Sequence, residues 1–76
     1  MKTFGQFLAE EREKKGWSRH DLAAKIKVAE STLGNIENGF RRLADLATWE
    51  RLSEIMGWTV ERRREILREY PMGDKR

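Results

Sequence analysis

The chain has 76 residues, of which 38% are apolar and 38% are charged, and its formal net charge is +3. This length allows one small domain, and no apolar run approaches the roughly 18 residues of a membrane-spanning helix. The absence of cysteine excludes disulfides, thiolate zinc sites and a cysteine nucleophile. The first residues lack the apolar run of a signal peptide, so we expect a cytoplasmic protein. With no cysteine and one histidine, His20, we expect no metal or cofactor.

Start and stop signals divide the chain into five short helices, and no segment keeps the two-residue alternation of a strand. The first helix begins at Thr3, whose spacing to Gln6 predicts a capping box, and it ends near Gly16. Ser18 and Asp21 have the same spacing and predict the start of a second helix of about two turns.

The third predicted helix has Leu33 and Ile36 on its buried side. It ends at Asn38 and Gly39, because both residue types tolerate the left-handed backbone conformation that follows many helices.

Asp45 caps a fourth predicted helix, and Thr59 opens a fifth, which Pro71 stops. Five helices joined by short links predict an all-α, compact five-helix bundle. We expect a single domain over residues 1–70, followed by a short C-terminal tail over residues 71–76.

The second and third helices match the pattern of a DNA-reading helix-turn-helix. This motif needs two short helices with a small residue where they cross, a tight turn and apolar anchors on both inner faces. Ala23 is the small residue, and Lys27 stands where the turn usually has glycine. A lysine with positive φ costs on the order of 1 kcal/mol, which a fold can absorb. The apolar anchors are Leu22, Ile26, Val28, Leu33 and Ile36.

Short blocks of residues extend this pattern along the chain. In order, they are Phe4-Gly5, Arg12, Gly16-Trp17-Ser18, Asp21-Leu22-Ala23, Ser31-Thr32-Leu33, Ile36-Glu37-Asn38-Gly39 and Leu52-Ser53-Glu54-Ile55-Met56-Gly57. Their order and spacing resemble the phage-repressor and Cro class of helix-turn-helix proteins, also called Xre-like or lambda-repressor-like. The resemblance covers residues 4 to about 62. It implies a lambda-repressor-like fold whose third helix, residues 30–38, reads the major groove of DNA.

The resemblance also assigns roles to individual residues. It implies a structural ion pair between Arg12 and Glu37, which ties the first helix to the third. Periodicity places polar residues of the third helix opposite its buried side, and the resemblance implies that three of them, Glu30, Ser31 and Asn35, contact bases. Asn35 suits an adenine edge and Glu30 a cytosine amino group. The residues that the resemblance places on backbone phosphates are Arg19, Asn38, Arg41 and Arg42.

The fifth helix departs from the resembled family, which often dimerises there to match a two-fold operator. Arginines at 62–64 stand where the family commonly has leucines, and apolar residues resume at Ile66, Leu67 and Tyr70. These three residues either cover the domain's own core or form a symmetric dimer seam, and the arginines are either solvated or contact phosphates. Phe40 either folds onto the core or joins a dimer contact.

Two functions from different classes follow. The first is a sequence-specific, double-stranded DNA-binding transcriptional regulator of phage or mobile-element type. It would most simply be a repressor that binds its operator as a homodimer. The second is a protein-interaction adaptor or antitoxin-type protein with a regulatory protein partner, which Glu30 favours because its charge repels phosphates. No nucleophile–base pair, phosphate loop or metal-ligand cluster supports an enzyme.

Overall fold

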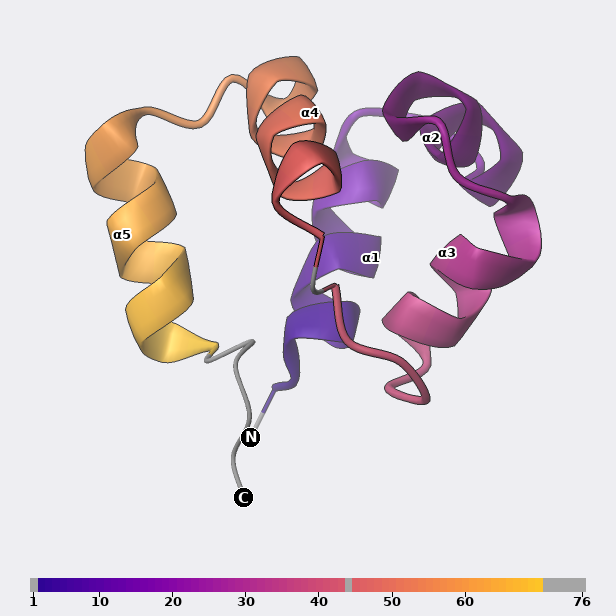
Figure 1. The fold of residues 1–76 in the computed structure, drawn as a ribbon, viewed down its shortest axis with the longest axis horizontal. Coiled ribbons are helices and arrows are strands. Elements are labelled where there is room, and N and C mark those ends of the chain that lie inside the picture. The colour runs from indigo at the N-terminus through magenta and orange to yellow at the C-terminus, as the bar shows by residue number, and fades with distance from the viewer. Residues whose placement is uncertain (1, 44, 71–76) are drawn as a thin grey trace.

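The computed structural model describes residues 2–43 and 45–70, and within them the chain forms helices and no strand (Figure 1). The five helices are α1 (Phe4–Lys14), α2 (Arg19–Ile26), α3 (Glu30–Glu37), α4 (Leu46–Met56) and α5 (Val60–Glu69). The predicted all-α five-helix fold is confirmed, and the third helix ends one residue earlier than predicted. The expected stop at Pro71 and the tail over 71–76 lie outside the described residues.

Hydrogen-bonded caps fix where α1 and α2 begin. The Thr3 hydroxyl accepts a hydrogen bond from the Gln6 N–H at 3.1 Å, and the Gln6 side chain accepts one from the Thr3 N–H at 2.9 Å. Ser18 and Asp21 form the same reciprocal pair, with both distances 3.0 Å. Each box satisfies two N–H groups that a helix start otherwise leaves without partners. Both predicted capping boxes are confirmed.

The starts of α4 and α5 differ from each other. Thr59 caps α5, since its hydroxyl accepts from the Arg62 N–H at 3.1 Å. Asp45 occupies the N-cap position of α4 as predicted, but its side chain makes no capping hydrogen bond to the backbone. Its carboxylate instead accepts from the Thr48 hydroxyl at 2.7 Å.

The core lies where all five helices meet. α1 and α4 occupy the middle of the molecule, with α2 and α3 on one side and α5 on the other (Figure 1). Aromatic rings attach α5 to α1, because Phe7 stacks on Trp58 at 5.9 Å and on Tyr70 at 5.0 Å between ring centroids. The buried apolar residues are Phe7, Leu8, Leu22, Ala23, Ile26, Leu33, Ile36, Leu43, Leu52, Met56, Trp58 and Ile66.

The turn between α2 and α3 contains the one non-glycine residue with positive φ in the described chain. Lys27 has φ 62° and ψ 45°, which is the left-handed conformation that glycine adopts at lowest cost. Next to it, the Val28 N–H donates to the Ala23 carbonyl at 3.0 Å and closes the end of α2. Lysine therefore occupies the strained position that the sequence pattern predicts.

Replacing Lys27 with glycine should stabilise the protein by about 0.5–1 kcal/mol, because relief of the left-handed strain exceeds the added entropy of the unfolded chain. A thermal melt should show Tm rising by a few degrees, given roughly 4–8 °C per kcal/mol for a domain of this size. Ala24→Gly, in the helical part of α2, is the matched control and should lose about 1 kcal/mol. An unchanged or lower Tm for Lys27→Gly would mean that this turn carries no strain.

Candidate nucleic-acid interface

The three residues predicted to contact bases share one exposed face of α3. Glu30, Ser31 and Asn35 are exposed, whereas Leu33 and Ile36 face the core with 0% and 4% of their surface accessible. Asn38, the C-cap residue of α3, is exposed beside them. The structure thus brings together a row of short polar side chains on a helix that has neither lysine nor arginine.

α3 has little stability of its own. It has eight residues, and the N-cap residue Ala29 makes no side-chain hydrogen bond to its first turn. Gly34 lies in its middle, and a missing cap and an interior glycine each cost a helix about 1 kcal/mol. Packing against the rest of the fold must therefore hold α3 in place.

A close approach of α1 supplies part of that packing. A Cβ atom built on Gly5 would lie 2.4 Å from the Ile36 carbonyl oxygen and 2.5 Å from that of Glu37. Real Cβ atoms do not come this close to backbone oxygen, so only glycine lets the start of α1 rest against the end of α3.

A buried ion pair forms a second connection between α1 and α3. Arg12 Nε donates to Glu37 Oε2 at 2.8 Å, and Arg12 Nη2 donates to Oε1 at 3.3 Å. Arg12 Nη1 donates to the Trp17 carbonyl at 2.9 Å, so each of the three guanidinium nitrogens donates a hydrogen bond. The hydrogen bond with Glu37 is the main reason that the pKa of Arg12 lies above its ordinary value. The structure therefore pairs the two residues that the resemblance implied.

Glu37 also binds a second arginine, which the sequence did not predict. Arg19 Nε and Nη2 both lie 3.2 Å from Glu37 Oε1. The Glu37 side chain is 1% exposed and that of Arg12 12%, whereas that of Arg19 is 40% exposed. One buried carboxylate thus holds a guanidinium inside the fold and another at its surface. The partners are 18 positions apart and on different helices, so no local sequence pattern reveals the contact.

Arg19 also lies across α3 at Gly34, where the helix has no side chain. The Cβ position of Gly34 is 3.3 Å from Arg19 Nη1 and 3.7 Å from Cδ and Cζ of the same side chain. Arg19, which was predicted to contact phosphate from α2, therefore borders the exposed face of α3 on one side.

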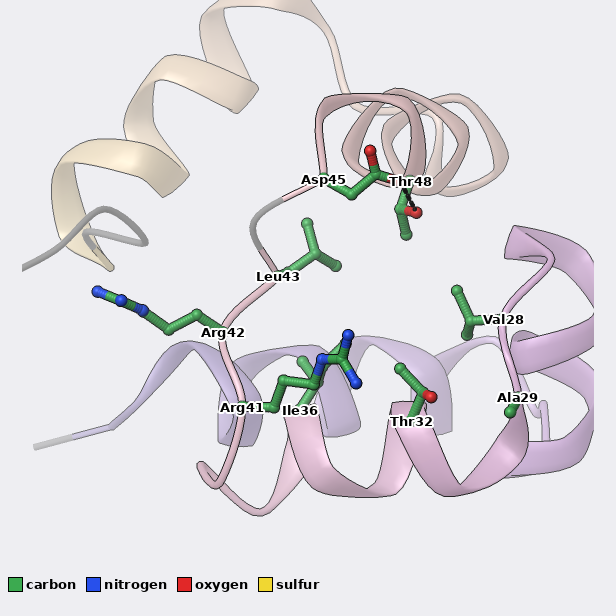
Figure 2. A pocket seen from close by; sticks show the side chains of 9 residues that line it. All are labelled: Val28, Ala29, Thr32, Ile36, Arg41, Arg42, Leu43, Asp45 and Thr48. Carbon is green, nitrogen blue, oxygen red and sulfur yellow. Dashed lines mark hydrogen bonds between the residues drawn. The ribbon is translucent and has the colours of Figure 1, made fainter.

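A cleft borders α3 on its other side. Gly34 and Thr32 are two residues apart and so point to nearly opposite sides of the helix. Figure 2 shows the Arg41 side chain turned back over α3 near Ile36, while Arg42 extends in the other direction. The cleft has a volume of about 530 Å³ and is lined by Val28, Ala29, Thr32, Ile36, Arg41, Arg42, Leu43, Asp45 and Thr48.

His20 lies next to one of the predicted base-contacting residues. Its Nδ1 is 3.5 Å from Glu30 Oε1, and both side chains are largely exposed, at 78% and 57%. The pair is ionic only when the imidazole is protonated. Glu30 on the exposed face thus has an imidazole neighbour on α2.

Of the three α5 residues considered for a dimer seam, the structure leaves one exposed. Ile66 is fully buried and Tyr70 stacks on Phe7, so both belong to the chain's own core, and only Leu67 is open, at 42% exposure. Ile66 therefore covers the domain's own core, the first of its two predicted placements, and a dimer contact through Leu67 stays a prediction. Tyr70, the C-cap residue of α5, follows Ile66 by four residues and contacts the core as Ile66 does, whereas Leu67 is turned about 100° away from Ile66.

Two large apolar side chains are exposed near the end of α3 and the start of α4. Phe40 is 81% exposed and Leu46 is 67% exposed. Phe40 therefore does not fold onto the core, which removes one of its two predicted placements.

The chain matches the family profile described as a helix-turn-helix domain over residues 3–66. It therefore belongs to this helix-turn-helix family, whose membership suggests a DNA-binding regulator. Searches of curated proteins and of solved structures give no significant match. In the described residues, no helix is both long and apolar enough to cross a bilayer.

Proposed function

We propose that this protein is a sequence-specific regulator of transcription, most simply a repressor of the phage-repressor and Cro class, that reads the major groove with α3. The observation that carries the proposal is the exposed polar face of α3, bordered by arginines on both sides. Glu30, Ser31 and Asn35 present hydrogen-bonding groups suited to base edges. The proposal assigns the chain no catalytic activity.

The distribution of charge supports a division between base reading and phosphate binding. α3 has no basic residue, so the affinity for phosphates must come from its surroundings. Arg19 lies on one side of α3, and Arg41 lies on the other with its side chain over the helix (Figure 2). With Asn38 and Arg42, they form the proposed set of backbone contacts.

We further propose that two copies bind one operator in the cytoplasm. A single α3 reads only a few base pairs, and a two-fold pair reads two half-sites about 34 Å apart. Selection of bound duplexes from a random DNA pool, followed by titration of affinity against salt, tests the whole proposal. A two-fold consensus with a steep salt dependence is the expected result. No enrichment at low salt would reject the regulator.

Asn35→Ala should relax specificity, because the asparagine amide can pair with both hydrogen-bonding groups of an adenine edge. We expect a loss of about 1–3 kcal/mol of discrimination at one base pair of each half-site. Asn38→Ala is the matched control. As a phosphate contact, it should weaken binding by a similar factor on every sequence. Competition assays with single-base operator variants separate the two effects, and an unchanged preference in Asn35→Ala would remove Asn35 from the reading face.

A second function, a protein-interaction adaptor or antitoxin-type partner, is favoured by the exposed Phe40 and Leu46. A protein partner would cover these two apolar side chains, which are 81% and 67% exposed in the free chain. This function predicts binding to a regulatory protein with weak salt dependence and no duplex enrichment in the selection.

A further inference from the structure

We propose that Glu37 is a positioning residue for DNA binding: it holds Arg19 across Gly34 so that the guanidinium presents a fixed edge to a backbone phosphate. This inference rests on the proposed DNA binding. It gives Glu37 a role beyond tying α1 to α3, and it gives a reason for glycine in the middle of α3.

The atoms of Arg19 that contact Glu37 define which side of the guanidinium remains. Nε and Nη2 form one edge of the planar group, and both lie 3.2 Å from Glu37 Oε1. The opposite end of the group, formed by Nη1 and the second hydrogen of Nη2, has three further N–H donors. An edge of this kind matches two oxygens of a phosphate, which lysine cannot match because its charge is a single point.

Gly34 provides the space that this arrangement needs. Arg19 Nη1, Cδ and Cζ all lie within 3.7 Å of the Cβ position of Gly34. An alanine there requires a shift of a few tenths of an ångström, while a longer side chain would occupy the volume of the guanidinium itself. Arg19 can therefore lie against α3 because residue 34 has no long side chain.

The charges of the cluster keep it attractive to phosphate. One carboxylate serves two guanidinium groups, so the three side chains together carry a net charge of +1. Arg12 is buried, and the accessible part of this positive charge is on Arg19, which is 40% exposed. Because Glu37 already restricts Arg19 in the free protein, binding a phosphate costs less rotamer entropy than ordering a mobile arginine would.

The first test compares Arg19→Lys with Arg19→Ala on a fluorescent duplex of mixed sequence. Arg19→Ala should lower affinity several-fold and reduce the slope of log K against log salt by about 0.9, the value for one lost phosphate contact. If Arg19 acts as a positioned edge, Arg19→Lys should bind closer to Arg19→Ala than to wild type. A lysine variant that binds like wild type would overturn the proposal, because charge alone would then suffice.

The second test addresses Glu37 and Gly34. Glu37→Gln should lower affinity about as much as Arg19→Ala, and the two changes together should cost no more than Arg19→Ala alone. Gly34→Leu should lower affinity by a similar factor, and it leaves the contact between Arg12 and Glu37 in place. It therefore replaces Glu37→Gln in this test if that variant does not fold. An additional loss of affinity from Gly34→Leu in the Arg19→Ala background would indicate a direct collision with DNA. It would overturn the inference that residue 34 acts by leaving space for Arg19. Glu10→Gln, at an exposed ion pair on α1, is the control and should leave affinity unchanged.

A measurement on the free protein separates this inference from the proposed function. In the NMR spectrum, the Nε–H proton of Arg19 should exchange slowly with water in the wild type and fast in Glu37→Gln or Gly34→Leu. Fast exchange in the wild type would overturn the positioning of Arg19 while DNA binding stands. If the wild type bound no duplex at any salt concentration, the proposed function and this inference would both fail.

Discussion

Glu37→Gln should lower the free energy of unfolding by about 3 kcal/mol, the largest stability effect that we expect from any single charged residue. The change leaves the Arg12 guanidinium, which is 12% exposed, with only the carboxylate of Glu13, which is 70% exposed and lies 4.0 Å from Nη2. Removal of one partner from a buried ion pair is costly because the remaining charge cannot return to water, and the solvent-screened Glu13 compensates it only weakly. Urea denaturation followed by circular dichroism measures the loss, with the midpoint shifting and the m-value unchanged.

Glu10→Gln makes the same chemical change at an exposed ion pair and is the matched control. Lys2 Nζ lies 2.6 Å from Glu10 Oε1, closer than any contact of Glu37, yet the two side chains are 43% and 49% exposed. Solvent screens this pair, so we expect Glu10→Gln to lose far less stability than Glu37→Gln. Equal losses in the two variants would show that burial does not govern the strength of the pair between Arg12 and Glu37.

Gly5→Ala should destabilise the protein by about 2 kcal/mol or more, although alanine favours a helix over glycine by about 1 kcal/mol. The added methyl group would meet the Ile36 and Glu37 carbonyl oxygens at 2.4 and 2.5 Å. Neither oxygen can move without displacing α3, so α1 and α3 must separate. Thermal unfolding should show Tm lowered by roughly 8 °C or more.

Gly34→Ala provides the opposite case within the same fold. Its methyl group would come within 3.3 Å of Arg19 Nη1, the end of a flexible side chain that can shift. The gain in helix propensity should then dominate, and we expect stability to rise by up to about 1 kcal/mol.

A Gly5→Ala protein as stable as the wild type would mean that α1 does not rest on α3 in solution.

The helices and their caps could be predicted from the sequence because their signals are local. Thr3 with Gln6 and Ser18 with Asp21 lie three residues apart and form their capping boxes within a single turn. The left-handed turn at Lys27 follows from the spacing of the surrounding apolar residues. Asp45 shows the limit of such signals, because a carboxylate at an N-cap can bond to the Thr48 hydroxyl instead of the backbone.

The candidate site could be predicted only in part. Periodicity separated the exposed face of α3 from its buried side, since one helix determines both. The contact of Arg19 with Glu37 and the approach of Gly5 to α3 depend on how different helices are placed, and that placement is not encoded at any fixed spacing. In α5, periodicity showed that apolar residues continue, but not that Ile66 turns inward while Leu67 stays at the surface.

The weakness of α3 in isolation determines how the protein folds and responds to a ligand. An isolated helix of eight residues, with an uncapped start at Ala29 and a glycine inside, is unstable in water. α3 therefore forms only together with its contacts to α1 and α2, and its amide protons should exchange at the rate of the event that opens those contacts. A duplex that binds α3 selects the fully folded chain, so the melting temperature should rise with duplex concentration.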